Sequence, residues 1–406
     1  MIELSSCDPI NHDDPQEPLA SFPRISEPLS YDEFFREFLE KNRPCVFSSS
    51  FTQEWLARED WVTPSNTPNV EFLRNHFGDG EVPVADCDQK HYDSQEKKTY
   101  KLRDYIDYWH SLRDPCLGKK SCLYLKDWHF VRDFPAYKAY STLQYFASDW
   151  LNEFWHVRSD IHDDYQFVYM GPKGSWTPFH ADVFRSYSWS ANVCGRKRWV
   201  FYPPGEDQFL RDPFGTPVYD VDSPDLKDIR KYPNAASAKG RIEVIQEQGE
   251  TIFVPSCWHH QVWNLEDTIS INHNWLNGTN LHRAWYFLVE SLQQVEYAIR
   301  DCSDMDDWTG QCQLLLHATH GMDYHEFYTF LQTIARRRIE TLTGKKTHLS
   351  FGIWENGKNH ILYDLKKIQW CLEQLLDDER LDTIKGFSDT ENHPSNLLDQ
   401  VVNVLS

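Results

Sequence analysis

The sequence predicts an α+β protein built around a double-sheet jelly roll or a β-barrel. Eight short β-type segments, separated by turn residues, follow one another between residues 167 and 275. Helical periodicity is found on both sides of this region. The composition, with 40% hydrophobic residues, 25% charged residues and 16 Trp, 20 Tyr and 24 Phe, is typical of a folded globular chain.

We expect five parts along the 406 residues. They are a loose N-terminal segment (1–28), an α/β part that packs on the core (29–165), the β core (166–277), a helical part (278–376) and a tail (377–406). The sequence leaves open whether the tail is ordered.

Two capped helices are expected near the start of the α/β part. Ser30 and Glu33 form the pattern of a capping box at the start of the first helix. The second helix is expected to have Thr67 as its N-cap, Pro68 at its first helical position and Gly78 just beyond its end. Strands at 82–87 and 122–126, with a helix at 102–112 between them, complete this part.

The strands of the β core are read from runs of β-branched and aromatic residues. They are expected at 167–170, 179–183, 186–194, 197–202, 242–245, 251–254, 258–265 and 268–275. Residues 205–241, rich in Pro, Asp and Gly, are too long for a hairpin loop, and insertions of this kind are often functional.

The helical part shows one clear apolar stripe. Further helices fit residues 324–342 and 358–376, and Thr279 is expected to cap the first helix. We expect these helices to pack against the β core. The stripe consists of Leu281, Trp285, Leu288, Leu292, Val295 and Ile299.

The charge and the cysteines restrict the class of protein. The net charge of −21 argues against the basic surface of a nucleic-acid-binding protein, and an acidic surface serves either solubility or a basic partner. The ten cysteines are scattered without a CxxC pair, as in a reducing compartment. The sequence shows no signal peptide and no membrane span. We expect a cytoplasmic protein, and nuclear entry stays open.

A metal site is indicated in the β core. His180 and Asp182 are two residues apart on a strand, so their side chains point to the same face. A third imidazole on a late strand, from His259, His260 or His273, would complete the two-His-one-carboxylate arrangement that suits non-haem Fe(II).

A lysine in the same region strengthens this hypothesis. Lys197 lies on a strand whose alternating apolar residues, Trp199 and Phe201, mark it as half-buried. A buried ammonium group is costly unless an anion meets it, and the distal carboxylate of a dicarboxylic cosubstrate would be such an anion. The alternative is a basic hairpin turn in water.

Several long motifs resemble the jumonji-C (JmjC) family of 2-oxoglutarate- and Fe(II)-dependent oxygenases. They are GPKGSWTPFHAD, SYSWSANVCGRKRW, FVPSCWHHQVWNLEDTISINHNW, CLYLKDWHF and DWLNEFW, and the resemblance extends over about residues 34–342. It implies a double-stranded β-helix, or cupin-like jelly roll, as the core. It also implies Fe(II) as the metal, with 2-oxoglutarate and O₂ as cosubstrates.

The resemblance assigns roles to individual residues. His180, Asp182 and His260 are implied as the metal ligands, and Lys197 as the partner of the 2-oxoglutarate C5 carboxylate. His259 would face the other side of the pleat, and His273 would lie in the core or behind the ligands. The remaining cosubstrate-binding candidates are Thr177, Asn272, Tyr124 and Ser190, of which Asn272 departs from the Thr often found at its position.

The resemblance also implies an activity. We expect a protein hydroxylase that couples oxidative decarboxylation of 2-oxoglutarate to hydroxylation of a lysyl residue in a translation release factor. An N-methyl-lysine demethylase and a non-catalytic binding module of the same fold are the alternatives. Direct nucleic-acid or membrane binding is not expected. A homodimer through the C-terminal helices is a further expectation, because related enzymes use such helices for dimerisation.

Overall fold

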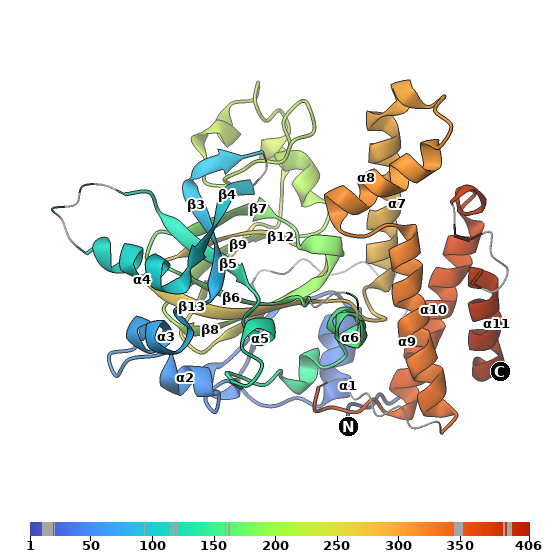
Figure 1. The fold of residues 1–406 in the computed structure, drawn as a ribbon, viewed down its shortest axis with the longest axis horizontal. Coiled ribbons are helices and arrows are strands. Elements are labelled where there is room, and N and C mark those ends of the chain that lie inside the picture. The colour runs from blue at the N-terminus through green and yellow to red at the C-terminus, as the bar shows by residue number, and fades with distance from the viewer. Residues whose placement is uncertain are drawn as a thin grey trace.

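Two β-sheets lie face to face at the centre of the computed structural model, and a group of helices stands beside them (Figure 1). The structure describes residues 1–9, 19, 21–92, 94–113, 116, 118, 120–158, 160, 163–344, 352–384, 386–387 and 392–406. The α+β prediction is confirmed, and of its two alternatives the jelly roll is the correct one. No helix within these ranges is long and apolar enough to cross a membrane.

The larger sheet contains nine strands, and all its neighbours are antiparallel except the β1 and β2 pair. The smaller sheet contains four antiparallel strands. In spatial order the larger sheet consists of β1 (Arg24–Ile25), β2 (Cys45–Phe47), β11 (Thr251–Val254), β8 (Tyr187–Cys194), β13 (Thr268–Trp275), β6 (Gln166–Gly171), β5 (Leu123–Trp128), β3 (Glu81–His91) and β4 (Ser94–Lys101). The smaller sheet consists of β10 (Ile242–Gln246), β9 (Lys197–Tyr202), β12 (His259–Asn264) and β7 (Trp176–His180).

Alternation along the strands gives the larger sheet two chemically different faces. On β13, Ile269 and Ile271 belong to the main hydrophobic cluster, whereas Asn272 lines a cavity between the two sheets. On β8, Ala191 belongs to the same cluster, whereas Ser190 lines the cavity. The inner face therefore presents polar groups to the smaller sheet, and the outer face must be covered by other elements.

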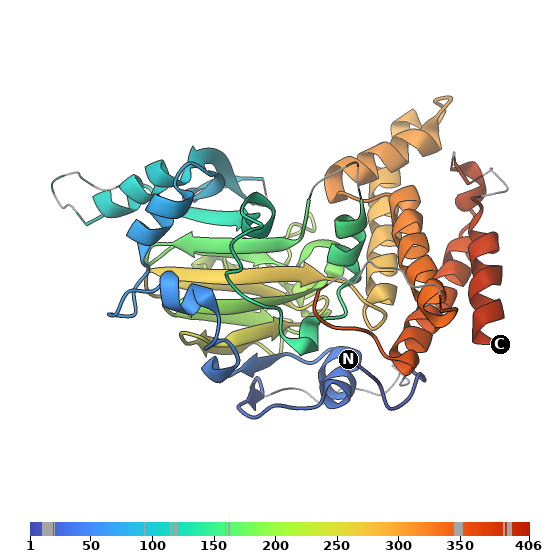
Figure 2. The ribbon, with the colours of Figure 1, turned by 60° about the horizontal axis from the view of Figure 1, so that its bottom comes forward.

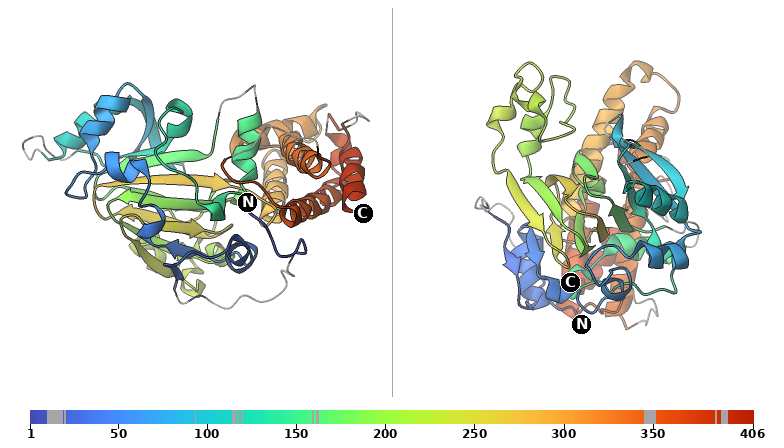
Figure 3. Two further views of the ribbon diagram at one scale, coloured as in Figure 1. Left: turned by 90° about the horizontal axis from the view of Figure 1, so that it is seen from below. Right: turned by 90° about the vertical axis from the view of Figure 1, so that its left-hand side faces the viewer.

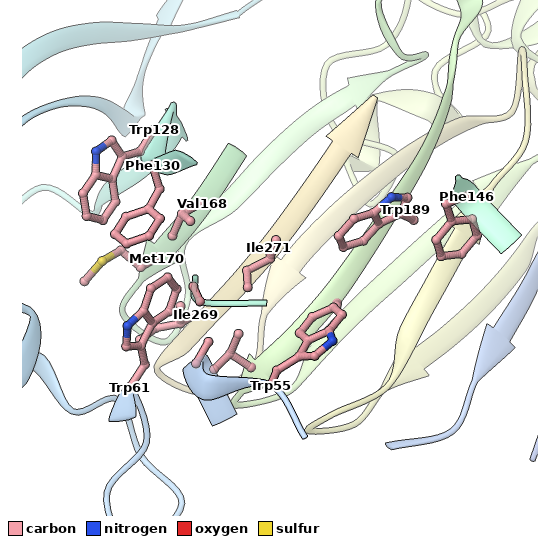
Figure 4. Packing of buried hydrophobic residues seen from close by; sticks show 14 of the residues in the cluster. Trp55, Trp61, Trp128, Phe130, Phe146, Val168, Met170, Trp189, Ile269 and Ile271 are labelled. Carbon is pink, nitrogen blue, oxygen red and sulfur yellow. The ribbon is translucent and has the colours of Figure 1, made fainter. Parts of the chain in front are cut away.

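N-terminal segments cover the outer face. Figure 4 shows Trp55 and Trp61, which flank α2 (Leu56–Asp60), beside side chains of the sheet. The ring of Trp55 lies 6.1 Å from that of Trp189 on β8, and Trp61 lies 5.0 Å from Phe130. Burying aromatic rings of this size is a large stabilising contribution, which explains the high tryptophan content. The remaining helices of this part are α1 (Tyr31–Phe34), which continues as a π-helical segment (Phe35–Glu40), α3 (Val70–Phe77), α4 (Leu102–Ser111), α5 (Phe130–Asp133) and α6 (Trp150–Val157).

The C-terminal helices form a second packed unit beside the sheets (Figures 2 and 3). They are α7 (Leu281–Ala298), α8 (Trp308–His320), α9 (Tyr324–Leu342), α10 (Lys358–Asp377) and α11 (Pro394–Leu405). The first four residues of the predicted stripe, from Leu281 to Leu292, are buried in the hydrophobic cluster of this unit, and Val295 and Ile299 are partly buried against it. The end of the tail, whose order the sequence left open, forms α11 and buries Leu397 and Val401.

The insertion at residues 205–241 lies on the outer side of the smaller sheet, where Leu210 and Val218 pack with Phe179 and Val200. It also reaches the β3–β4 hairpin, because the Tyr219 hydroxyl donates to the backbone carbonyl of Ser94 at 3.4 Å. Figure 3 shows the hairpin and the insertion rising at the same end of the roll. The insertion is therefore a packed part of this end of the β core.

Two predicted helix caps are wrong, and Pro68 lies before α3 and not at its first position. Asn69, not Thr67, is the N-cap of α3, and its side-chain oxygen accepts the backbone N–H of Phe72 at 3.3 Å. Asn280, not Thr279, precedes α7, while the Thr279 hydroxyl donates to the side-chain oxygen of Asn277 at 2.5 Å. The capping box of Ser30 and Glu33 is confirmed.

A buried ionic network joins the helical unit to α6. Arg338 of α9 donates two hydrogen bonds of 3.0 Å to Glu153 of α6 and one of 2.7 Å to Asp364 of α10. Arg338→Ala removes the guanidinium that Glu153 and Asp364 share and leaves Arg337 and His360 as their partners, so we expect a loss of about 3–5 kcal/mol in the free energy of unfolding, measured by urea denaturation. The exposed neighbour Arg336 is the control, since Arg336→Ala should change the free energy of unfolding by about 0.5 kcal/mol or less. A loss at Arg338 no larger than at Arg336 would contradict this role.

Candidate metal and cosubstrate site

His180, Asp182 and His260 meet in the cavity between the sheets. One ligand atom from each of the three residues lies within 4.8 Å of the other two. His180 ends β7 and is directly opposite His260 on β12, so sheet pairing brings together two residues that are far apart in the sequence. Their ring centroids are 4.4 Å apart.

Backbone carbonyls orient both imidazoles. Nδ1 of His180 lies 2.8 Å from the carbonyl oxygen of Pro178, and Nδ1 of His260 lies 3.0 Å from that of Trp258. If these nitrogens donate, each Nε2 lone pair is free for a metal, which is the usual support of a metal-binding histidine. Burial lowers the pKa of His180 to about 4, and His260 adds to this shift, so the ring is neutral at physiological pH.

Asp182 lies beyond the strand and not on it. The strand predicted at 179–183 ends at His180, and residues Val183–Arg185 form a short 3₁₀ helix. Phe184 and Arg185 in this turn have φ values of 54° and 53°, which are strained for residues with side chains. The Ser188 hydroxyl donates to the Asp182 carboxylate at 2.7 Å and fixes its direction.

Lys197 is buried in the same cavity, with 2% of its surface exposed. Its ammonium group donates to the hydroxyls of Ser270 at 2.8 Å and Tyr124 at 3.3 Å. No carboxylate forms an ion pair with it within the described part of the chain, and burial lowers its pKa to about 7. The hairpin-turn alternative does not hold for Lys197, because this lysine is a buried cation whose direct partners are hydroxyls.

The cavity has a volume of about 460 Å³ and is lined by all the predicted cosubstrate-binding residues. Besides Lys197 these are Thr177, Asn272, Tyr124 and Ser190. The Ser190 hydroxyl is buried and has no hydrogen-bond partner among the residues that the structure describes, which leaves a donor for a ligand. The side-chain amide of Asn272 donates to the Ser270 hydroxyl at 3.2 Å and thereby belongs to the group of polar side chains around Lys197.

The two other histidine candidates lie outside the cluster. His259 points to the opposite side of β12, where its Nδ1 is 3.6 Å from an Asp207 carboxylate oxygen. His273 points to the outer face of the larger sheet and contacts the Tyr140 hydroxyl at 2.5 Å. Alternation along the strands explains both placements.

A second group of potential ligands, His129, Asp163 and Asp164, lies nearer the surface. The Arg132 guanidinium contacts Asp163 at 3.3 Å. A cation within the group neutralises the carboxylate charge that a metal would need, so this group is better described as an ion-pair cluster.

Sequence reasoning missed several polar residues of the cavity, among them Ser188, Lys126 and Asp127, and it missed Ser270, which accepts a hydrogen bond from Lys197. Ser188 and Ser270 lie on strands whose inner face was predictable by alternation, so that signal was available. Lys126 and Asp127 are consecutive and nevertheless both line the cavity. The alternation of a regular strand would have placed these two residues on opposite faces.

The residues fit Fe(II) and 2-oxoglutarate. Two imidazoles and one carboxylate are a donor set suited to Fe(II), and their convergence on one side leaves coordination positions for other ligands. The buried ammonium of Lys197 and the hydroxyl of Ser190 offer a charge and a donor to the far carboxylate of a keto-diacid.

The low pKa of Lys197 predicts proton uptake when 2-oxoglutarate binds. The carboxylate needs the charged ammonium, but an amine with a pKa of about 7 is mostly neutral at higher pH. We therefore expect the affinity to fall as the pH rises from about 6.5 to about 8.5, by up to roughly tenfold per unit. Calorimetry in buffers of different ionisation enthalpy measures the uptake, and Lys197→Met should remove it. An affinity that is independent of pH over this range would contradict the role of Lys197.

Comparisons with known proteins find a family model and relatives whose names fit a site for iron and 2-oxoglutarate. A family model described as a cupin-like domain matches residues 31–280. The protein "2-oxoglutarate and iron-dependent oxygenase JMJD4" of Danio rerio is 48% identical over 364 residues, which cover 87% of this chain and 86% of the relative. The protein of the same name from Homo sapiens is 46% identical over 384 residues, with 93% and 90% covered. "Arginine-specific demethylase JMJ20" of Arabidopsis thaliana is 45% identical over 320 residues, with 75% and 67% covered.

Proposed function

Because the chain belongs to the cupin-like domain family, together with the oxygenases named JMJD4, we propose that it is an Fe(II)- and 2-oxoglutarate-dependent oxygenase that hydroxylates a protein. The resemblance to the JmjC family, and within it to JmjC domain-containing protein 4, is confirmed by these relatives. The observation that carries the proposal is the presence of His180, Asp182, His260 and the buried Lys197 in one cavity.

The residues of this chain would act mainly by binding and orientation. His180, Asp182 and His260 would hold the metal from one side, and Lys197 would neutralise the far end of 2-oxoglutarate. Fixing both ends of the cosubstrate selects one orientation before reaction, which lowers the entropic part of the barrier. Thr177, Asn272, Tyr124 and Ser190 would contribute hydrogen bonds around it. Fe(II), when bound, supplies the oxidative chemistry with O₂ and 2-oxoglutarate.

We further propose a lysyl residue of a translation release factor as the substrate, and the cytoplasm, where translation terminates, as the location. The support is the resemblance described above and the net charge of −21, which favours a basic partner.

A homodimer through the C-terminal helices is part of the same proposal and is supported by the exposed rings of Tyr286 and Tyr297 on α7. Light scattering tests the dimer, and a monomer over a range of concentrations would exclude it.

Mass spectrometry of the release factor after incubation with enzyme, Fe(II) and 2-oxoglutarate tests the substrate. We expect the gain of one oxygen atom on a lysine, with one succinate formed for each hydroxylation. The matched control is enzyme without 2-oxoglutarate. Succinate formation without any modified lysine would contradict the substrate while leaving the oxygenase assignment intact.

Demethylation is the second candidate, because one relative is named an arginine-specific demethylase. Peptides with methylated lysine or arginine distinguish the two reactions: loss of a methyl group supports demethylation, and gain of oxygen on an unmethylated side chain supports hydroxylation. If the protein neither binds 2-oxoglutarate nor converts it to succinate, the third alternative, a non-catalytic binding module, replaces both.

A further inference from the structure

A second carboxylate, that of Asp127, lines the cavity that contains His180, Asp182 and His260. Asp127 lies on β5 at the point where the pairing with β6 shifts, between Leu125 and Trp128. Its φ of 61° is left-handed, unlike that of an ordinary strand residue. Consecutive residues of a regular strand point to opposite faces, whereas this irregularity lets both Lys126 and Asp127 reach the cavity.

The Asp127 carboxylate is held by one fixed group and one flexible group. The Tyr169 hydroxyl donates to Oδ1, and the ammonium group of Lys97 donates to Oδ2. The Lys97 side chain comes from the β3–β4 hairpin and is 45% exposed, and the Asp127 side chain is 31% exposed. Burial alone would raise the pKa of Asp127, but the cations of Lys97 and Lys126 lower it below its usual value, so the group is a carboxylate.

Tyr169, whose hydroxyl donates to Asp127, lines the same cavity as His180, Asp182 and His260. Burial raises the pKa of Tyr169 well above its usual value. The negative charges of Asp127 and, more weakly, Asp182 raise this pKa further. Tyr165, Phe167 and Tyr169 all line the cavity, with successive ring centroids 6.2 and 6.4 Å apart. This aromatic wall suits the aliphatic part of a long cationic side chain.

We propose that Asp127 determines specificity by binding the ammonium group of the substrate lysine, and that Lys97 occupies this place when no substrate is bound. The inference rests on the proposed hydroxylase function and names the residue that recognises its substrate. An ammonium group needs a single acceptor, whereas a guanidinium group pairs best with two oxygens at once. Tyr169 already engages Oδ1, so Oδ2 is the oxygen that an exchange with Lys97 frees, and the site favours lysine over arginine.

The test compares kcat/KM for the purified release factor between wild type and Asp127→Asn, which keeps the shape and removes the charge. We expect a loss of about 10- to 100-fold, located in the KM of the protein substrate and not in the Kd of 2-oxoglutarate. Lys97→Met removes the competing ammonium and should raise kcat/KM by a few fold. The matched control is Glu96→Gln on the same hairpin, where Glu96 contacts Lys98 on the surface.

The outcomes separate this inference from the proposed function. Wild-type hydroxylation of the release factor with an unchanged kcat/KM in Asp127→Asn overturns the inference alone. Conversion of 2-oxoglutarate without hydroxylation of any lysyl substrate by wild type overturns both the proposed substrate and the inference. A loss in Lys97→Met as large as in Asp127→Asn shows that Lys97 itself supports the substrate, which overturns its role as an occupant of the site.

Discussion

His180→Ala is expected to abolish hydroxylation because it removes one of the two imidazoles from the proposed Fe(II) site. Loss of even a supporting contact of a metal ligand lowers affinity by about 10- to 100-fold, so loss of a ligand should lower Fe(II) affinity by more than about 100-fold. Anaerobic Fe(II) binding measures this directly. The metal-free variant should still fold, because the only hydrogen bond that the His180 ring makes within the described residues is the one to the Pro178 carbonyl.

The control for this variant is His325→Ala, at an exposed histidine of α9. It should bind Fe(II) like wild type. The second readout is thermal unfolding: Fe(II) should raise the melting temperature of wild type and His325→Ala, and leave that of His180→Ala unchanged. Stoichiometric Fe(II) binding by His180→Ala with wild-type affinity would show that this residue is not a ligand.

Lys197→Met is expected to keep Fe(II) but to bind 2-oxoglutarate poorly. Removing one partner of a buried, hydrogen-bonded charge pair costs about 2–5 kcal/mol, which corresponds to a roughly 30-fold or larger increase in Kd. Anaerobic titration with 2-oxoglutarate measures it. The same variant should not destabilise the ligand-free protein, because it replaces a costly buried amine with an apolar chain of similar length.

This combination separates cosubstrate binding from a structural role of Lys197. Lys227→Met, at an exposed position of the insertion, is the control and should leave both the Kd of 2-oxoglutarate and the stability unchanged. If Lys197→Met unfolds more easily than wild type and binds 2-oxoglutarate equally well, the amine serves the fold and not the cosubstrate.

Much of the fold could be predicted from the sequence because its core elements are strongly periodic. The strands at 197–202, 251–254 and 268–275 and the helix at 324–342 have the predicted bounds. The prediction missed β4, whose polar sequence forms a strand only because β3 supplies the hydrogen-bonding edge. It also missed α8, whose exposed Leu314 and buried Leu316 do not form a clean apolar stripe.

The candidate site could be predicted only in part from the sequence. Residue types and spacing indicated His180, Asp182 and a buried Lys197, but three histidines remained as the third ligand until the resemblance was considered. The structure brings His260 to His180 through strand pairing and turns His259 and His273 away. Asp127 could not be predicted, because its position depends on a left-handed backbone conformation that no local pattern of the sequence signals.

A crystal structure of the anaerobic complex with Fe(II) and 2-oxoglutarate, with anomalous differences measured at the iron edge, tests the central claim most directly. The account predicts one iron peak bonded to Nε2 of His180, Nε2 of His260 and the Asp182 carboxylate. It also predicts that the ammonium group of Lys197 contacts the distal carboxylate of 2-oxoglutarate. An iron peak away from these three side chains, or a 2-oxoglutarate molecule that leaves Lys197 without contact, would contradict it.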